Sequence, residues 1–438
     1  MNLEILIIRS VLLIWKGTRY HLGVEKLRVL NVSSGDLIGS RFNGYDWHDN
    51  LLNFGVETSM LVHWNHISTF DWVDQLENFN KGSRAESAIR KRYQLNQYQG
   101  DETANLPWSS NIFNHPFYKS ADVIHLQIVH DGTLDFHTIG RIMKEKPTVW
   151  TWHDPWPLTG HCVYPMNCSR WEKGCGKCPD LVRPFRVGHD KTKENRISKE
   201  NLIAGKYSLH VSTNWFADLI AAKEITDLPK PIVIPFGINS QQFTKIDKSQ
   251  ARKKLGIPEK SFVIGIRATF EKQKNYKSFL NAIDLMPKIE NMTILTLQEI
   301  NTLAKNTSKF NVIDLGWTND NLALAEFFAA IDLFIMPSEY ETFGFMSIEA
   351  MSTGTPVLAI GGTAIDEICD LKQNGYSLID GSPAEIVKSL LQILDNQKEL
   401  RVRGEKSQNH IKRNFDMNVF CKELVELYHS TKEDFDRR

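Results

Sequence analysis

The stretch "DLFIMPSEYETFGFMSIEAMSTGTPVLA", Asp332 to Ala359, predicts one complete strand–helix–strand unit. Its apolar start at 332–336 is typical of a buried strand, and a polar loop follows. A helix is then predicted over 345–353, ended by Gly354, before the next strand at 355–359. Units of this kind build parallel sheets that are covered by helices, so the stretch indicates an α/β fold.

Short apolar runs rich in Val, Ile and Leu recur on both sides of this unit, with helical patterns between them. The first series of expected strands lies at 28–32, 58–62, 122–127, 147–151, 207–212 and 231–235. The second series lies at 261–266, 292–297, 311–315, 332–337, 356–360 and 376–379. Continuous apolar runs of this length favour parallel strands that are buried on both faces. Each half therefore predicts a doubly wound, Rossmann-like domain, and the cleft between the two is the expected active site.

Length and charge agree with a chain of two globular domains. The 438 residues exceed the size at which a single hydrophobic core stops growing. The 52 basic and 52 acidic residues balance, so charge does not favour nucleic acid as a partner. Proline, glycine and polar residues cluster at 234–243, where we place the join. We expect a first domain over 27–235, a second domain over 236–415 and a final helix over 416–438.

Residues 1–26 form an apolar extension before the first domain. The run "LEILIIRSVLLIW" at 3–15 is shorter than the about 20 residues of a spanning helix, and it carries Glu4 and Arg9. It also lacks the basic start and the cleavage site of a signal peptide. Three interpretations stay open: an extension without fixed structure, an upstream start codon, and an amphipathic anchor at a membrane surface. Without secretion, we expect the chain in the reducing cytoplasm.

The alternation of strands and helices breaks down between His63 and Lys119. This stretch is polar and carries scattered aromatic residues. The sequence leaves a solvated face, a lid and an acceptor-binding element open as interpretations.

Charged residues gather around the helix that the opening stretch predicts. The backbone at 343–345 presents free N–H groups and the positive end of the helix dipole, which suit a phosphate. Glu341 precedes the helix and Glu349 lies within it, and carboxylates of this kind grip ribose or hexose by accepting hydrogen bonds from vicinal hydroxyls. Arg267 and Lys274 supply two cations that would neutralise a diphosphate. This combination predicts a site for a nucleoside diphosphate sugar.

Several motifs in a fixed order resemble one family of enzymes. The E-x7-E element from Glu341 to Glu349 contains "FG" and is continued by "EAM". The other matching motifs are "GTPV" at 354–357, "GGTAIDEI" at 361–368, "VIPFGIN" at 233–239 and "LGW" at 315–317. The set resembles family 4 of the retaining glycosyltransferases, which have the GT-B fold. The segment "TWHDPWPLTGHC", with the cysteines after it, is similar to the subgroup that assembles bacterial surface polysaccharides, such as the colanic-acid-type transferases.

The resemblance implies a role for each residue of the second half. Arg267 and Lys274 would hold the donor diphosphate and stabilise the charge that develops on the leaving group. Glu341 would contact the transferred sugar, and Glu349 would bind the ribose. The sugar hydroxyls and the phosphates would meet the backbone of Thr342, Phe343, Gly344 and Phe345.

For the first half, the resemblance implies that His153 lines the donor-sugar pocket. Gly35 and Gly39 would occupy the loop after the first strand, where small residues let the backbone approach the diphosphate. This loop departs from the tighter glycine pair of the family, because "GDLIGSRFNG" carries the bulky Arg41 and Phe42. The departure leaves the shape of the acceptor side undetermined.

The resemblance also implies the reaction. A sugar would pass with retention from a nucleoside diphosphate donor to a growing, lipid-linked surface glycan, by attack on the face that the leaving group departs from. No Asp-x-Asp motif appears at a strand end, so no cofactor is expected in catalysis. The final helix, 416–438, crosses back onto the first domain in this fold. We expect the enzyme in the cytoplasm, with peripheral attachment to the inner face of the plasma membrane as an open alternative.

Two other classes of function stay open. An epimerase or a phosphorylase of the same fold would use a similar sugar substrate, and a non-catalytic, zinc-bearing binding module would have kept only the fold. The spacing of Glu341 and Glu349 favours transfer. Substitution of Glu341 or Arg267 distinguishes the classes, because only an enzyme loses sugar transfer while its folding stays intact.

Four of the six cysteines, Cys162, Cys168, Cys175 and Cys178, lie in one loop over 161–180. Four thiolates can satisfy tetrahedral Zn²⁺, and the "GCGKC" turn resembles the hairpin of a zinc knuckle. A redox dithiol at Cys175 and Cys178 is disfavoured because it lacks a thioredoxin-like context, and a disulfide would need an oxidising compartment. We interpret the loop as a structural element that shapes the acceptor side, with a structural Zn²⁺ and free thiols as the two alternatives.

Overall fold

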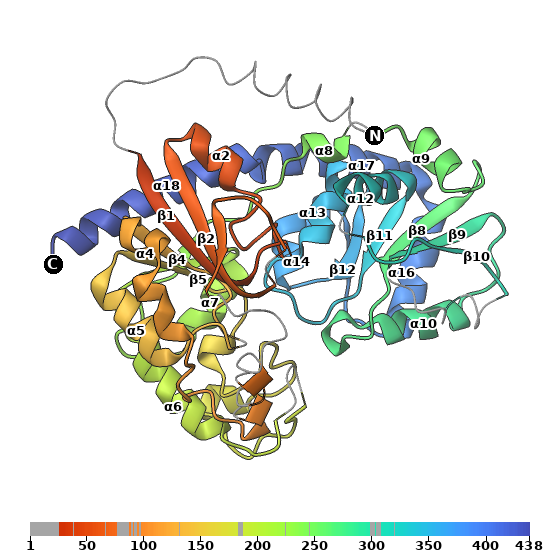
Figure 1. Ribbon diagram of the computed structural model, residues 1–438. Helices are drawn as coiled ribbons and strands as arrows, with labels where there is room; N and C mark the ends of the chain where they lie inside the picture. The colour runs from red at the N-terminus through yellow and green to blue at the C-terminus, as the bar shows by residue number, and fades with distance from the viewer. Residues whose placement is uncertain are drawn as a thin grey trace.

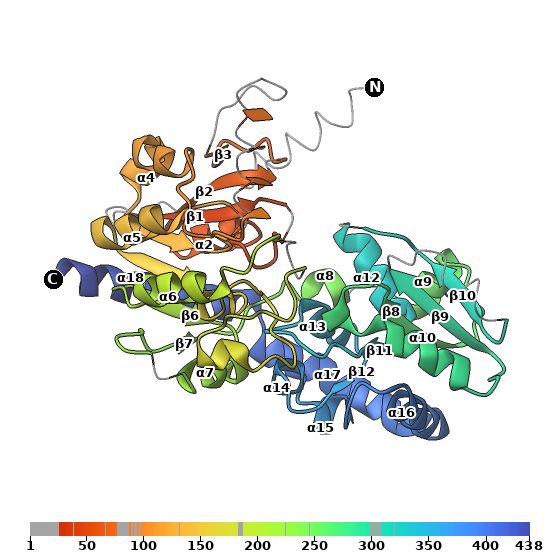
Figure 2. The ribbon, with the colours of Figure 1, turned by 90° about the horizontal axis from the view of Figure 1, so that it is seen from below.

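The computed structural model of this chain describes residues 26–438, except 38, 66, 77–86, 89–90, 92–93, 96–97, 131, 183–186, 224, 245, 298–302, 304–307 and 319. The apolar extension therefore lies outside the described residues, apart from Lys26. Two lobes, each built around one parallel sheet, lie side by side (Figure 1, Figure 2). This arrangement confirms the predicted pair of doubly wound domains.

In the described part of the chain, the sheet of the first domain has seven parallel strands in the order β3-β2-β1-β4-β5-β6-β7. Its strands are β1 (Leu27–Gly35), β2 (Val56–Asn65), β3 (Val73–Gln75), β4 (Val123–Leu126), β5 (Thr148–Thr151), β6 (Ser208–Val211) and β7 (Ile232–Val233). Its helices are α2 (His48–Asn53), α4 (Pro116–Ser120), α5 (Phe136–Glu145), α6 (Thr192–Ile203) and α7 (Asn214–Ala221). The strand order reverses between β1 and β4, which makes that position the switch point of the sheet.

The sheet of the second domain has six parallel strands among the described residues, in the order β10-β9-β8-β11-β12-β13. Its strands are β8 (Phe262–Arg267), β9 (Met292–Leu297), β10 (Asn311–Asp314), β11 (Leu333–Met336), β12 (Val357–Ile360) and β13 (Tyr376–Leu378). Its helices are α8 (Gln241–Thr244), α9 (Lys248–Lys254), α10 (Tyr276–Leu285), α12 (Asn321–Ala330), α13 (Phe345–Ser352), α14 (Ala364–Cys369), α15 (Leu371–Asn374), α16 (Pro383–Asp395) and α17 (Gln397–Asn414). Here the order reverses between β8 and β11.

Every strand predicted from an apolar run is present within a few residues of its expected position. Between His63 and Lys119, where the sequence predicted no regular pattern, the described residues include β3 and the start of α4. A strand of three residues is too short to show a hydrophobic period. Helix α4 begins at Pro116, where the side chain of His115 accepts a hydrogen bond from the backbone N–H of Phe117.

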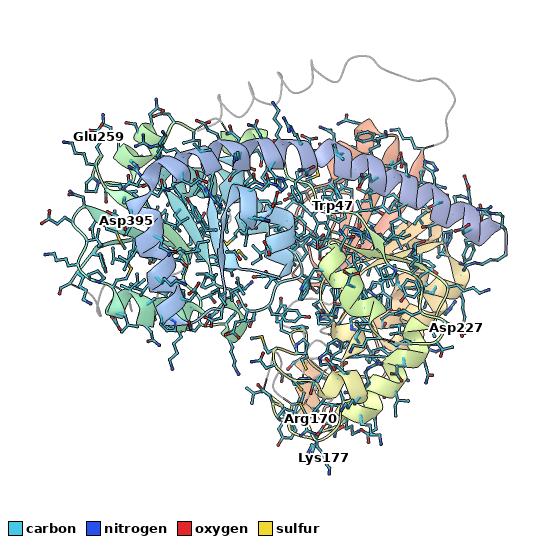
Figure 3. The ribbon with its side chains drawn as sticks, turned by 180° about the vertical axis from the view of Figure 1, so that it is seen from behind. Trp47, Arg170, Lys177, Asp227, Glu259 and Asp395 are labelled. Carbon is cyan, nitrogen blue, oxygen red and sulfur yellow. The ribbon has the colours of Figure 1, made fainter. Side chains whose placement is uncertain are left out.

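The chain crosses between the domains twice, at adjacent positions. Ile238 donates its backbone N–H to Phe415 O (2.9 Å) and accepts one from Met417 (3.2 Å). Helix α18 (Met417–Asp436) then runs along the first domain (Figure 1, Figure 3). There Tyr428 OH lies 2.8 Å from His125 Nδ1 of β4, and Thr431 donates to Ser208 of β6. The last helix is therefore part of the first domain's packing.

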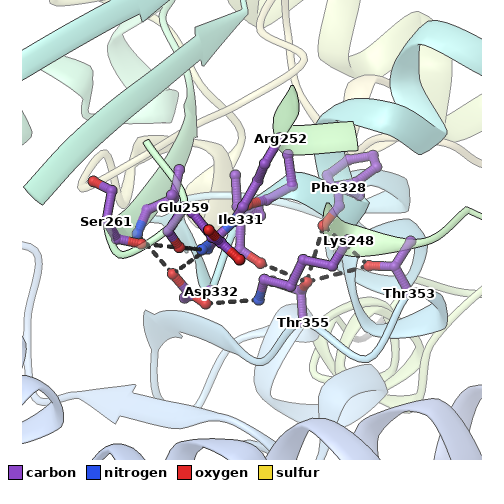
Figure 4. Close-up of polar contacts among 11 residues, drawn as sticks. Lys248, Arg252, Glu259, Ser261, Phe328, Ile331, Asp332, Thr353 and Thr355 are labelled. Atoms are coloured by element: carbon purple, nitrogen blue, oxygen red, sulfur yellow. Dashed lines mark hydrogen bonds and ion pairs between the residues drawn. The ribbon is translucent and has the colours of Figure 1, made fainter. Parts of the chain in front are cut away.

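Asp332 anchors β11 at the end away from the predicted site (Figure 4). Its Oδ2 accepts hydrogen bonds from Arg252 Nη2 (2.6 Å) and from the backbone N–H of Val263 (2.7 Å). Its Oδ1 accepts one from Lys248 Nζ at 2.6 Å. One carboxylate thus ties α9, β8 and β11 together and fixes the strands whose other ends carry the charged residues.

Candidate active site

The residues predicted for the second half lie at the carboxyl ends of neighbouring strands. Arg267 ends β8, and Lys274 lies in the short 3-10 turn that follows it (Lys272–Lys274). The loop 337–344 follows β11, which pairs with β8 at the switch point. Ligands of doubly wound sheets bind in the crevice at such a point. The topology therefore brings these residues to one edge of the sheet.

The first turn of α13 can accept an anion. Gly344 precedes the helix with φ 99°, a left-handed conformation that favours glycine. The Ser347 N–H donates to the Gly344 carbonyl (3.0 Å), but no described side chain caps this end, so the N–H groups before Ser347 lie at the positive end of the helix dipole without a side-chain cap. Phe343 and Phe345 both pack on Phe236, at ring-centroid distances of 5.2 and 5.4 Å. The turn is therefore held in place by aromatic packing.

The two predicted cations already have partners. Lys274 Nζ lies 2.5 Å from Glu341 Oε1, and both side chains are largely buried. The Arg267 guanidinium lies 5.5 Å from the ring centroid of Trp317, an exposed indole. This ion pair orients Lys274 and Glu341, so a diphosphate and a sugar hydroxyl meet groups that are already in place.

Glu349 is the most unusual carboxylate of the site. Its side chain is 1% exposed, yet neither carboxylate oxygen accepts a hydrogen bond from any described residue. Among the described residues its ion-pair partner is Arg41 of the first domain, whose Nε lies 2.6 Å from Oε1. Burial raises the pKa of Glu349, and the Arg41 charge partly opposes this shift. A buried acceptor without hydrogen bonds needs a donor from a ligand or from water.

His153 follows β5 and faces the second domain. Its Nε2 lies 2.9 Å from Gln127 Oε1, which can only accept, so Nε2 carries the proton and Nδ1 is left as an acceptor. The ring stacks on Phe236 at 5.7 Å. Burial lowers the pKa of His153 to about 3, with His210 and His130 adding to the shift and Asp154 opposing it. His153 is therefore a neutral hydrogen-bonding group at neutral pH.

The loop after β1, described at residues 36–37 and 39–46 and here called the first loop, is held by several backbone hydrogen bonds. Gly35 is the last residue of β1, which corrects its expected place in the loop. The Asp36 carboxylate accepts hydrogen bonds from the backbone N–H groups of residues 67 and 68, at 2.8 and 2.7 Å. Gly39 has φ 83°, and a Cβ there would lie 2.7 Å from the Phe42 ring. Glycine at 39 thus makes room for Phe42.

Hydrogen bonds join the two domains around these residues. Thr342 Oγ1 donates to the backbone carbonyl of His153 (2.6 Å), and its own carbonyl accepts from Thr213 Oγ1 (3.0 Å). Glu367 of α14 accepts from the backbone N–H groups of Asn214 (2.8 Å) and Trp215 (2.7 Å), at the start of α7. The loop 337–344 is thereby fixed against the wall that carries His153.

The cysteine loop, 161–180, leads from this wall toward the edge of the first domain, where Figure 3 labels Arg170 and Lys177. Gly160 donates its N–H to Cys175 Sγ at 3.2 Å. Burial raises the pKa of Cys162 to about 12, and the neighbouring thiols of the loop add to the shift. Within the described ranges, no three His, Cys, Asp or Glu side chains are placed to hold a metal as they stand.

Four of the residues that lie near the site were not predicted from the sequence. Arg41 and Phe42 appeared only as bulky departures from a glycine loop, and Gln127 had no motif around it. Tyr164 of the cysteine loop packs on Tyr340 at 5.6 Å. Burial raises the pKa of Tyr164, and the charges of Glu341 and Asp154 add to the shift. Two features of the sequence could have indicated these residues. One is the bulk of Arg41 and Phe42 in the first loop, and the other is the position of Tyr164 between two cysteines.

Comparisons with known proteins agree with this geometry. Residues 247–410 match the family described as "Glycosyl transferases group 1". The chain is 24% identical over 291 residues to the putative colanic acid biosynthesis glycosyl transferase WcaC of Escherichia coli K12. That match covers 61% of this chain and 66% of WcaC, so the chain spans just under two thirds of this relative's length.

Solved structures with low sequence identity share the fold. Sucrose-phosphate synthase from Thermosynechococcus elongatus superposes with a TM-score of 0.67 at 14% identity, over 92% of this chain and 99% of that chain. Anabaena HepE in complex with UDP and glucose gives a TM-score of 0.61 at 15% identity, over 92% and 100%. The two doubly wound domains of this chain therefore have the GT-B arrangement.

Proposed function

We propose that this chain, whose residues 247–410 belong to the group 1 glycosyl transferases, transfers a sugar from a nucleoside diphosphate to a growing glycan. The observation that carries the proposal is Glu349, a buried carboxylate whose oxygens accept no hydrogen bond from the described residues. Vicinal ribose hydroxyls supply the two donors that such a carboxylate lacks. The free first turn of α13 and the cations Arg267 and Lys274 lie at the same edge of the sheet, where a diphosphate would follow the ribose.

In the proposed reaction, the bond between the anomeric carbon and the diphosphate oxygen breaks while the acceptor oxygen bonds to the same carbon. Arg267, Lys274 and the start of α13 stabilise the negative charge on the departing diphosphate. Glu341 and neutral His153 orient the sugar, because each can accept a hydrogen bond from a hydroxyl. The departing phosphate oxygen takes the acceptor's proton, so attack on the same face retains the configuration. In this mechanism, positioning of the substrates and stabilisation of the developing charge supply most of the rate acceleration.

The acceptor in this proposal is a lipid-linked surface polysaccharide or oligosaccharide. WcaC, the relative named above, is described as a putative colanic acid glycosyl transferase, which supports a surface glycan. A lipid-linked acceptor would bring the enzyme to the cytoplasmic face of the plasma membrane. Among the helices that the structure describes, none is both long enough and apolar enough to cross a membrane.

The test is a panel of UDP-, GDP-, ADP- and dTDP-sugars, with release of the nucleoside diphosphate as the signal. Arg267→Ala and Glu341→Ala should each slow release by about a hundredfold or more, because each removes charge or orientation at the reacting centre. Glu326→Gln is the matched control, since Glu326 pairs with Lys254 on the outside of α12. All variants should keep the wild-type circular dichroism spectrum at the assay temperature, although Glu341→Ala should melt at a lower temperature because it leaves the largely buried Lys274 without its partner.

The same panel separates the alternatives. An epimerase returns a changed nucleotide sugar, which chromatography resolves from a released nucleoside diphosphate. A binding module shows no turnover in the wild type and no response to Arg267→Ala. Failure of every donor to turn over, while nucleotides still bind, contradicts the proposed transfer.

A further inference from the structure

Arg41 reaches from the first loop of one domain to Glu349 of the other. Its Nε lies 2.6 Å from Glu349 Oε1, and its side chain keeps 32% of its surface exposed. The contact therefore joins a half-exposed cation to a fully buried carboxylate. Since Glu349 accepts no hydrogen bond from the described residues, this ion pair is the interaction that offsets the cost of burying its charge.

The backbone around Arg41 is fixed to the first domain. Trp47 Nε1 donates to the Arg41 carbonyl at 3.0 Å, and Trp47 is buried. Asn43 Nδ2 donates to the carbonyls of Gly35 (2.8 Å) and Asp36 (2.7 Å). Ser40 Oγ donates to Asp46 at 3.0 Å. These contacts tie down the backbone beside Arg41, so release of Glu349 needs either a rotation of the Arg41 side chain or a separation of the domains.

The neighbouring Phe42 occupies the space between the two domains at the same place. Its ring lies 5.1 Å from the His153 ring and 6.0 Å from the Phe345 ring. Phe345 is the first residue of α13, the helix whose N-terminus is the proposed phosphate site. The first loop therefore covers the donor site at two points. Arg41 pairs with Glu349, and the Phe42 ring lies beside the start of α13.

We infer that Arg41 competes with the nucleotide for Glu349 and so gates the ribose position of the donor site. This inference rests on the proposed function, because it takes Glu349 as the ribose carboxylate. In the donor-free chain the carboxylate is held by Arg41. Binding of a nucleoside diphosphate replaces that ion pair by hydrogen bonds from the ribose hydroxyls and pushes Arg41 aside. The observed affinity is lowered by the fraction of molecules in which Glu349 is occupied.

The test is the affinity for UDP, GDP, ADP and dTDP, measured by calorimetry. Arg41→Met should bind the preferred nucleoside diphosphate about threefold to tenfold more tightly than the wild type, because the competing partner is gone. Arg41→Lys keeps the positive charge but has fewer hydrogen-bond donors, so its affinity should lie between those of the wild type and Arg41→Met. Arg28→Met is the matched control: it removes the same charge from the same domain, where Arg28 pairs with Asp122, and should leave the affinity unchanged.

A double-mutant cycle distinguishes competition for Glu349 from a general effect of charge. Glu349→Gln should weaken nucleotide binding, and in that background Arg41→Met should have no further effect. If Arg41→Met binds equally or more weakly while the wild type binds and turns over a donor, the competition is refuted and the proposed function stands. If no nucleoside diphosphate binds to the wild type or to either Arg41 variant, both proposals fall.

Discussion

At the scale of single residues, burial decides which side chains of the first sheet carry charge. His125, His153 and His210 lie on or directly after neighbouring strands and are held by hydrogen bonds to neutral partners. Burial lowers the pKa of each, to about 3 for His153 and about 4 for His210. The wall behind the proposed donor sugar is therefore a neutral, hydrogen-bonded layer, and the positive charge of the site comes from Arg and Lys.

This layer predicts a pH-dependent stability. The folded pKa of His210 is depressed below its unfolded value of 6.5, so the unfolded chain binds the extra proton between about pH 6.5 and 4. Stability from this group is fully present above pH 6.5 and is lost as the pH falls. Between pH 6.5 and 5.5 the wild type should lose about 1 kcal/mol more unfolding free energy than His210→Gln. Urea unfolding at several pH values measures this difference, and identical pH profiles would contradict it.

At the scale of elements, Asp332 should matter more for stability than for chemistry. Asp332→Ala removes acceptors from Arg252, Lys248 and the N–H of Val263 together. We expect a loss of about 2 kcal/mol in unfolding free energy, because partly buried donors are left without partners. Denaturant unfolding measures it, with Glu326→Gln on α12 as the control for one lost exposed ion pair. An unchanged midpoint would show that water replaces the carboxylate at no cost.

We also propose that the cysteine loop holds a structural Zn²⁺. The backbone is left-handed at four consecutive residues, 174–177, two of which are not glycine. Such strain persists only where surrounding interactions enforce it, and metal–thiolate bonds would do so. The thiols would have to rotate toward one another, since the described side chains form no metal site as they stand.

Metal analysis of the purified chain should find about one zinc ion. Cys175→Ser should lose the ion and lower the melting temperature, whereas Cys369→Ser, in the buried α14, should keep it. Chelation should release the ion and expose titratable thiols. Four titratable thiols in the untreated protein, without metal, would leave the loop as a purely hydrogen-bonded structure.

At the scale of the whole molecule, polar contacts and aromatic packing together set the relative position of the domains. Glu367 places a carboxylate at the start of α7, where the backbone N–H groups and the helix dipole favour an anion. The chain itself crosses between the domains at Ile238 and Met417. The Glu367 hydrogen bonds are one part of this interface that can break without unfolding either domain.

Removal of the Glu367 contact should open the molecule. Glu367→Ala should increase the radius of gyration in small-angle scattering and speed proteolysis between the domains, with a small change in melting temperature. Asp366→Asn is the control on the same helix, because Asp366 bonds only locally to Gly362 in the described contacts. Scattering curves that superpose for the wild type and Glu367→Ala would show that Arg41 and Thr342 suffice to keep the domains closed.

The sequence by itself determined the two sheets and the charged edge of the second one. Apolar runs located the long strands, and the spacing from Glu341 to Glu349 placed both carboxylates around the start of one helix. These features are local, because a βαβ unit has a fixed hand and its loop, helix and strand follow one another in the chain. Secondary structure therefore fixes them before the domains meet.

Only the tertiary structure decided what meets these residues across the interface. Thr342 bonds to His153 from 189 residues away, and Arg41 reaches Glu349 from the opposite domain. No periodicity or motif encodes such pairs, since they depend on how two separately folded domains dock. In the sequence Arg41 was a bulky exception in a glycine loop. In the folded chain it is the charge that occupies the carboxylate on which the proposed function depends.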